Sequence, residues 1–281
     1  MDSKPEARSP KLVTYYAAVA ERMVPFLVGR KLAVEQRFRA GERPVYRRHE
    51  GTGGARKWIE VRTADDVVRW AKQRAVAFHA HLKPEGSGAW FLLDIDSRAL
   101  PTEMARLGAS HALDVIEEAG LRALVKFSGS DGFHLMWEMP DLRALGRRDL
   151  WDFERAVVEA IARRVEARLA ADRRAAPIRA AVGPGAPLIS TNSQLEDPVE
   201  RAALLFDKLI LKANANARVP YSLHPASGLV SVPLDRAGLE RFDEAMAAPE
   251  VVAVDDRRWE MPRNGVAEVK RALAGWSDGD G

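Results

Sequence analysis

The sequence predicts an α+β fold, in which helices mix with mostly antiparallel strands (a mixed α/β arrangement). Long segments carry apolar residues at the three- and four-residue spacing of amphipathic helices, most clearly 101–120 and 148–173. Shorter apolar or alternating segments are bounded by glycine or proline, and 121–140 has the strand–turn–strand pattern of a hairpin. Helices mixed with hairpins favour this class over a purely parallel sheet.

The first 85 residues are predicted to contain two helices and several short strands. Residues 10–28 have helical spacing, with Pro25 near their end. The second helix spans 63–73, where Thr63 is the N-cap and acidic residues follow it at the positive helix N-terminus. The predicted strands and connections are KLAVEQRF (31–38), the turn RAGER (39–43), PVYRRHE (44–50), the glycine loop EGTGGARK (50–57), KWIEVR (57–62) and AVAFHAHL (75–82).

The rest of the chain alternates between the two kinds of element. The predicted elements are a strand at 89–96, a helix at 101–120, the hairpin at 121–140, a helix at 148–173, an irregular loop at 175–190, a helix-like stretch leading into LLFDKLIL (204–211), an extended segment with a tight turn at 218–234 and a helical tail at 235–276.

The composition excludes several classes of protein. The 281-residue chain contains no cysteine, which excludes disulfides, thiolate zinc sites, iron–sulfur clusters and cysteine nucleophiles. No apolar run approaches the roughly 18–20 residues that a membrane span needs. The N-terminus also lacks the apolar stretch of a signal peptide. We therefore expect a soluble cytoplasmic protein that does not bind membranes.

Positive charge is concentrated in the N-terminal part. Residues 1–62 carry 14 Lys or Arg against 7 Asp or Glu, although the whole chain has a net charge of only +3. Arginines stand beside aromatic residues in RFRAGERPVYRRH (37–49) and ARKW (55–58). This pattern suits contacts to phosphates and bases of a nucleic acid, and a solvated arginine-rich surface is the alternative interpretation.

Two aspartates lie one residue apart in a mostly apolar strand. In AWFLLDID (89–96), strand alternation puts Asp94 and Asp96 on one face and Ile95 on the other. Two neighbouring carboxylates in an apolar element are unfavourable unless a positive charge neutralises them. A divalent metal ion is the usual solution, because hard cations take carboxylate oxygens. The alternative is a helix cap and a surface acid that follow a strand.

A glycine turn and a third acid complete the set of candidate sites. SGSDGFH (128–134) offers backbone N–H groups to a phosphate, with His134 beginning the outgoing strand, although hairpins also close in this way. Asp207 is a lone acid in the apolar run LLFDKLIL, where a buried, hydrogen-bonded aspartate is the alternative. Ser222 and His224 precede another turn. Together these features suggest a carboxylate metal site with phosphate ligands near it.

These motifs resemble those of the archaeo-eukaryotic primase superfamily. FLLDID, KFSGSDGFHL and FDKLILKANANARVPYSLHPASGLVSVPL match its D-x-D pair, its S-G-x-x-G-x-H turn and its third aspartate. The order of motifs over about 10–235 is most similar to the polymerase domain of ligase D-type end-joining enzymes. His224 stands where that group usually has arginine, SLHPASG is closer to replicative primase small subunits, and 176–205 matches neither pattern.

The resemblance implies a fold and a reaction. We expect a primase-like catalytic core of two packed sub-modules with an RRM-like sheet, in a single catalytic domain over 1–281. Its expected parts are a basic sub-module at about 10–85, the motif-bearing core at about 86–235 and a helical tail at 236–281. The implied reaction is template-dependent nucleotidyl transfer, which adds NTP or dNTP to a DNA primer or broken end in end-joining repair or gap filling.

The resemblance also implies roles for individual residues. Asp94, Asp96 and Asp207 are expected to be catalytic and to hold two divalent ions, Mg²⁺ or Mn²⁺. The residues expected to bind the nucleotide are Ser128, Gly129, Ser130, Gly132, His134, Ser222, His224, Arg218 and His79. The residues expected to bind DNA are Arg47, Arg48, His49 and Lys57. A Ku-like end binder and a separate ligase are the expected protein partners, and the expected location is the cytoplasm, at the nucleoid.

Other functions remain open at this point. A true primase would start RNA chains without a primer, and SLHPASG favours it while the lack of cysteines disfavours a replicative subunit. A non-catalytic nucleic-acid-binding protein of the same fold should lack one or more of the three acids. A metal-dependent phosphoesterase would remove nucleotides from a DNA end instead of adding them.

Overall fold

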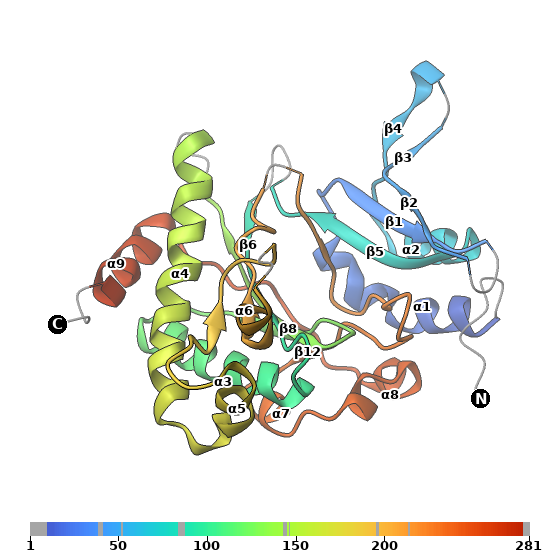
Figure 1. The fold of residues 1–281 in the computed structure, drawn as a ribbon. Coiled ribbons are helices and arrows are strands. Elements are labelled where there is room, and N and C mark those ends of the chain that lie inside the picture. Colours follow the sequence, from blue (N-terminus) through green and yellow to red (C-terminus); the bar gives the residue numbers. More distant parts are fainter. Residues whose placement is uncertain are drawn as a thin grey trace.

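A computed structural model describes residues 10–38, 42–51, 53–83, 88–142, 145, 147–194, 197–212 and 214–277 (Figure 1). The helices are α1 (Pro10–Met23), α2 (Ala64–Lys72), α3 (Thr102–Glu118), α4 (Arg147–Ala171), α5 (Ala176–Val182), α6 (Pro198–Ala202), α7 (Arg236–Glu240), α8 (Pro249–Val254) and α9 (Val266–Ser277). The strands are β1 (Leu32–Gln36), β2 (Val45–Arg47), β3 (His49–Glu50), β4 (Lys57–Trp58), β5 (Ala75–His81), β6 (Ala89–Asp96), β7 (Leu124–Phe127), β8 (Gly132–Met139), β9 (Ile189–Ser190), β10 (Leu204–Phe206), β11 (Asn216–Arg218) and β12 (Pro233–Leu234). Within these ranges, no helix has the length and apolar character needed to cross a bilayer.

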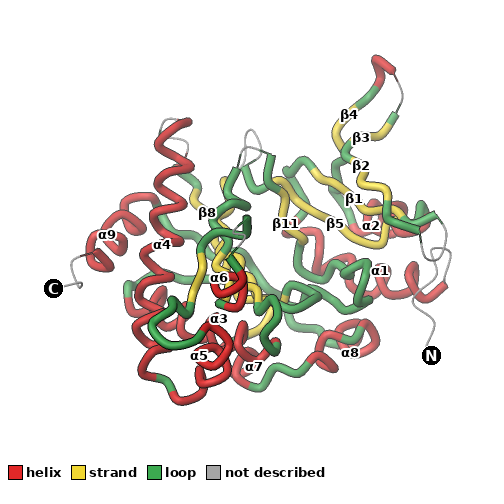
Figure 2. Tube along the Cα trace, in the orientation of Figure 1, coloured by secondary structure: helices red, strands yellow, loops and turns green. Residues whose placement is uncertain are grey.

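Two sheets organise the molecule, as the tube in Figure 2 makes visible. A four-stranded sheet has the order β11-β5-β1-β2, and a six-stranded sheet has the order β12-β7-β8-β6-β10-β9. All pairings in both sheets are antiparallel except that of β9 with β10. The predicted mixture of helices and mostly antiparallel strands is therefore confirmed.

The six-stranded sheet is covered on the face that bears Ile95. Helix α3 contacts β6, β8 and β10. Its Gly108 packs against the side chains of Ile95 and Leu204, and a Cβ there would lie 3.1 Å from Leu204. Because successive strand residues point to opposite faces, Asp94 and Asp96 lie on the face away from α3. Helix α4 packs on α3, and α9 packs on α4 (Figure 1).

The four-stranded sheet packs on α1 through aromatic side chains. Tyr16 has no exposed surface, lies edge-on to Phe78 at 5.0 Å and donates its hydroxyl proton to the carbonyl of Val76 at 2.7 Å. Tyr15 donates to the carbonyl of Tyr221 at 2.7 Å. The first helix is thereby fixed both to its own sheet and to a segment more than 200 residues later.

The segment from β11 to β12 belongs to both sheets. It pairs with β5 at Arg218, opposite His79, and ends as the edge strand beside β7. Between these strands, Ser222 Oγ accepts a hydrogen bond from the amide of Phe78 at 2.8 Å. One chain segment therefore joins the edge of the N-terminal sheet to the sheet that carries the aspartates.

Most predicted elements are confirmed, but three differ. Helix α2 begins at Thr63 with both bonds of a capping box, and α4 spans nearly the predicted 148–173. The strand predicted at 57–62 is only β4, Lys57–Trp58, and the helical tail predicted at 235–276 is interrupted by the non-helical residues 255–265. The predicted loop at 175–190 instead contains α5 and β9. Pro177 stands in the first turn of α5, where proline is tolerated, and Gly183 ends the helix with a φ of +85°.

A buried ion pair joins α4 to the end of the N-terminal sheet. Lys83, just after β5, lies 2.7 Å from the carboxylate of Glu154, which has no exposed side-chain surface. The Lys83 ammonium also lies 4.2 Å from the ring centroid of Trp151. Burial raises the pKa of Glu154. Removing one member of this ion pair would leave the other charge buried without a partner, which is strongly destabilising.

We expect Glu154→Gln to lower the free energy of unfolding by about 3 kcal/mol, because it leaves the buried Lys83 charge without its partner. Asp152→Asn on the same helix is the matched control, since Asp152 is exposed and lies 3.7 Å from Arg155. That control is expected to cost less than about 0.5 kcal/mol. Chemical denaturation of both variants measures the difference, and equal losses would contradict the role given to the buried pair.

Candidate functional site

Three carboxylates occupy neighbouring positions on the uncovered face of the six-stranded sheet. The register pairs Leu205 with Asp96 and Phe206 with Ile95, so Asp207 comes next, opposite Asp94. The amide of Asp207 donates to the carbonyl of Asp94 at 2.9 Å and continues the ladder by one residue. Directly opposed residues point to the same face, with Cβ atoms about 5 Å apart. Strand pairing thus brings together acids that are more than 100 residues apart in sequence.

The three acids oppose one another electrostatically. Burial is the main cause that raises the pKa of Asp94, and the Asp207 carboxylate raises it further. Burial, followed by the Asp94 carboxylate, raises the pKa of Asp96. Both effects disfavour the ionised form. The protein therefore holds negative charge here at a cost, which a bound cation would offset.

A histidine and a lysine extend the same row of the sheet. The ladders pair Asp94 with His134 on β8, and His134 with Lys126 on β7. His134 Nε2 lies 3.1 Å from Asp94 Oδ1, and Lys126 Nζ lies 2.7 Å from His134 Nδ1. Burial lowers the pKa of both His134 and Lys126. The neighbouring Lys126 and Arg218 lower the pKa of His134 further.

The glycine turn wraps around the hydroxyl of Ser128. Ser128 Oγ accepts hydrogen bonds from the amides of Ser130 and Gly132, each at 3.2 Å. A Cβ at Gly132 would lie 2.3 Å from Asp96 Oδ1, so only glycine permits this strand to approach the aspartate. Gly129 has a φ of +96°, which also favours glycine. The turn is held rigidly beside the carboxylates.

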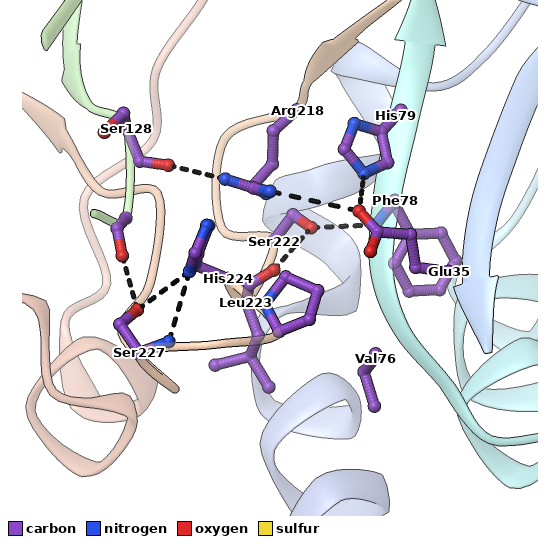
Figure 3. Close-up of polar contacts among 12 residues, drawn as sticks. Glu35, Val76, Phe78, His79, Ser128, Arg218, Ser222, Leu223, His224 and Ser227 are labelled. Atoms are coloured by element: carbon purple, nitrogen blue, oxygen red, sulfur yellow. Dashed lines mark hydrogen bonds and ion pairs between the residues drawn. The ribbon is translucent and has the colours of Figure 1, made fainter. Parts of the chain in front are cut away.

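Arg218 connects this turn to the other sheet, as Figure 3 shows. Its guanidinium donates to the carbonyl of Ser128 at 3.0 Å and lies 3.9 Å from Glu35 Oε1. The same Glu35 oxygen lies 2.7 Å from His79 Nε2. Burial lowers the pKa of Arg218, and Glu35 opposes that effect. A short polar chain therefore spans the two sheets next to the aspartates.

His224 and Ser222 occupy different surroundings. His224 Nδ1 lies 3.2 Å from the hydroxyl of Ser227, which in turn donates to the carbonyl of Gly129 at 2.5 Å (Figure 3). Burial and the nearby Arg218 lower the pKa of His224 to about 4, so this ring is neutral near pH 7. Ser222 has no exposed surface and bonds Phe78, so its hydroxyl belongs to the contact between the sheets.

The four expected DNA-binding residues lie on or beside β2 and the β3–β4 hairpin, which projects from the body of the molecule (Figure 1). His49 and Trp58 face each other across this hairpin, with ring centroids 4.5 Å apart. Arg48 lies over the ring of Tyr46 at 5.4 Å, and Tyr46 lies 5.6 Å from His79. An exposed basic and aromatic surface therefore leads toward the polar chain at His79.

The structure adds residues that the sequence did not single out. Lys126, Glu35, Ser227 and Ser231 all bond to predicted site residues or to each other. Lys126 carried a signal, since it is the one cation in the apolar strand LVKF just before the glycine turn. No sequence pattern pointed to Glu35, because its role depends on which strand lies beside β1.

The carboxylates fit a divalent cation by donor type and position. Asp94 Oδ1 is buried and accepts no hydrogen bond from the described residues. Asp207 Oδ1 accepts from the amide of Leu209 at 2.8 Å. Within the described part of the chain, no three metal-ligating side chains already converge on one point. Side-chain rotation on this shared face would bring the oxygens together around a hard cation.

Comparisons with known proteins show which family and which fold this chain resembles. The family model described as LigD, primase-polymerase domain, matches residues 10–180. The multifunctional non-homologous end joining protein LigD of Pseudomonas aeruginosa is 29% identical over 193 residues, which are 66% of this chain and 20% of that protein. The chain thus spans about a fifth of the length of this curated relative.

A solved structure shares the fold. The polymerase domain from Mycobacterium tuberculosis ligase D, in complex with DNA, superposes with a TM-score of 0.59 at 17% identity. The match covers 95% of this chain and 88% of that chain. This similarity confirms the predicted fold class over almost the whole chain.

The crowding of acids predicts that Asp96→Asn stabilises the metal-free protein. A raised folded-state pKa means that stability is lost as pH rises through that pKa, so the gain should be larger at about pH 8.5 than at about pH 5. We expect a gain of about 1–2 kcal/mol at the higher pH. Thermal unfolding in excess chelator measures it. Asp256→Asn, at an exposed acid, is the control and should show no such pH dependence. A destabilised Asp96→Asn variant at alkaline pH would contradict the proposed repulsion.

Proposed function

The chain belongs to the LigD primase-polymerase domain family, and from that membership we propose that it is a template-dependent nucleotidyltransferase that extends a DNA primer or a broken DNA end. The observation that carries this proposal is the ladder bond from Asp207 to Asp94, which puts three acids on one face of the sheet. Two-metal nucleotidyl transfer needs such a cluster of carboxylates.

We propose that Asp94, Asp96 and Asp207 hold two Mg²⁺ or Mn²⁺ ions. When bound, these ions would lower the pKa of the primer 3′-hydroxyl and neutralise charge on the triphosphate. The chain's own residues would then orient the reactants. Gly132 leaves room for Asp96 beside the turn, and the Asp207–Leu209 bond fixes one oxygen of the third acid.

Nucleotide binding would use the donors around the carboxylates. His134 and the turn from Ser128 to Gly132 lie beside Asp94 and Asp96 in the ladder. Arg218 adds a buried positive charge at the same turn. His224 lies against Gly129 of the turn, and His79 contacts Glu35, which lies beside Arg218. The triphosphate would thus meet positive charge and N–H donors while the acids hold the metal ions.

DNA would bind along the projecting basic hairpin and β2. Arg47, Arg48, His49 and Lys57 lie there, together with the partly exposed Tyr46 and Trp58. Arginine and lysine suit the DNA backbone, and aromatic rings suit unpaired bases. The structural neighbour from Mycobacterium tuberculosis is a complex with DNA, which supports DNA binding as such.

A place in end joining follows as a further part of the proposal. The Pseudomonas aeruginosa relative is a multifunctional end-joining protein of which this chain matches one fifth. We propose that residues 1–281 act as one catalytic domain at chromosomal DNA. A ligase and a Ku-like end binder would supply the remaining activities.

The metal-site assignment predicts that Asp94→Ala abolishes nucleotide addition. We expect the rate of primer extension to fall at least about 100-fold, which corresponds to about 2.7 kcal/mol of transition-state stabilisation. DNA affinity, measured by fluorescence anisotropy at fixed salt, should persist because the basic hairpin is intact. Asp256→Ala is the matched control and should extend primers normally. Undiminished addition by Asp94→Ala would remove Asp94 from the site.

The primer requirement separates this function from its closest alternative. We expect labelled nucleotide to appear only on a supplied 3′-end, on gapped or end-joined substrates, with either NTP or dNTP. New short RNA from template and NTPs alone would establish de novo priming instead. Loss of label from a pre-labelled end would indicate a phosphoesterase.

A further inference from the structure

Lys126 is a buried cation that the proposed reaction does not use. Its side chain has no exposed surface, and it stands in the middle of β7 between Val125 and Phe127. A lysine is placed at such a position only if polar partners compensate for the lost hydration. Its partners are His134 Nδ1 at 2.7 Å and Ser231 Oγ at 2.8 Å.

The hydrogen-bond partners fix the direction of each bond. Ser231 has a single hydroxyl proton, which it donates to the carbonyl of Phe127 at 2.8 Å. Ser231 Oγ can therefore only accept from Lys126. A protonated Lys126 has three donors and no acceptor, and His134 Nδ1 then also accepts from it. The ring then carries its proton on Nε2.

Nε2 is the ring nitrogen on the side of the carboxylates. His134 Nε2 lies 3.1 Å from Asp94 Oδ1, on the same transverse row of the sheet. In the opposite arrangement, an uncharged Lys126 amine would accept from Nδ1–H, and Nε2 would present a lone pair to Asp94. With Asp94 ionised, as in the metal-binding form of the site, two acceptors would then face each other, next to two further carboxylates. The observed neighbours favour the first arrangement.

We propose that Lys126 is a positioning residue that locks His134 in the Nε2–H tautomer, so that the ring presents a hydrogen-bond donor to the carboxylate face. Two consequences follow. His134 is then excluded as a ligand of the metal ions, because its free nitrogen is turned toward Lys126. Its donor is available to Asp94, and to the polyphosphate of a nucleotide, the second of which rests on the proposed function.

The tautomer is measurable without any assay of activity. The long-range ¹H–¹⁵N correlation spectrum of histidine-labelled protein separates the two ring nitrogens. The chain has 6 histidines, and the signals lost in His134→Gln identify those of His134. We expect a protonated Nε2 and an unprotonated Nδ1 in the metal-free wild type. A proton on Nδ1 would overturn the proposal, whether or not the protein extends primers.

Two variants test whether Lys126 is the cause. Lys126→Met removes the donor with an apolar chain of similar length, and the two tautomers of His134 should become mixed. Ser231→Ala removes the other partner of Lys126 but leaves the Lys126–His134 bond, so the Nε2–H tautomer should persist. A fully retained tautomer in Lys126→Met would contradict the proposal. Near-ultraviolet circular dichroism checks that each variant is folded.

Steady-state kinetics with ATP and a primed template give the functional readout. With the two tautomers mixed, about half of the His134 rings still present the donor, so Lys126→Met should raise KM for ATP by about 2-fold. The kcat should fall less, and Lys126→Arg should restore part of the affinity. A Lys126→Met variant with unchanged KM would show that the tautomer does not serve nucleotide binding. An inactive wild type would instead refute the proposed function and leave the spectroscopic result standing.

Discussion

The bond from the amide of Asp207 to the carbonyl of Asp94 forces two carboxylates side by side, with Asp96 two residues along the same strand. Backbone pairing decides this placement, because directly opposed residues in a sheet share a face. The other face is closed by α3, so the acids lie on the face away from that helix. Repulsion among them follows from position alone, and it makes a cation the natural occupant of this surface.

The surroundings of the acids limit that repulsion without removing it. Lys126 and Arg218 bring positive charge to the row and to the turn, but each is held by other partners: Lys126 by Ser231 and His134, and Arg218 by the Ser128 carbonyl and Glu35. Asp94 Oδ1 remains buried and without a hydrogen bond from the described residues. The hydrogen-bond donors of the site are thus already held in place, while the negative charge of the carboxylates is not fully compensated. This combination is expected for a pre-organised metal site.

Much of this could be predicted from the sequence, because a charged residue inside an apolar strand is conspicuous. Asp94, Asp96, Asp207 and the glycine turn were found in this way, and the structure brings them together. Lys126 could have been found, since the turn at 128–132 sets the register that pairs it with His134. Glu35 could not, because its contact with Arg218 requires β11 to join the N-terminal sheet across about 180 residues. The prediction of a loop at 175–190 was wrong because proline and glycine do not only break helices. Here Pro177 stands at the start of a helix and Gly183 at its end.

The most direct test of the central claim is a crystal structure of the protein with Mn²⁺, in which anomalous scattering locates the metal. We expect at least one manganese peak bound by carboxylate oxygens of Asp94, Asp96 and Asp207 together, with His134 outside the coordination shell. A saturated crystal with no peak at these residues, or with Asp207 directed away from a metal held by others, would contradict it.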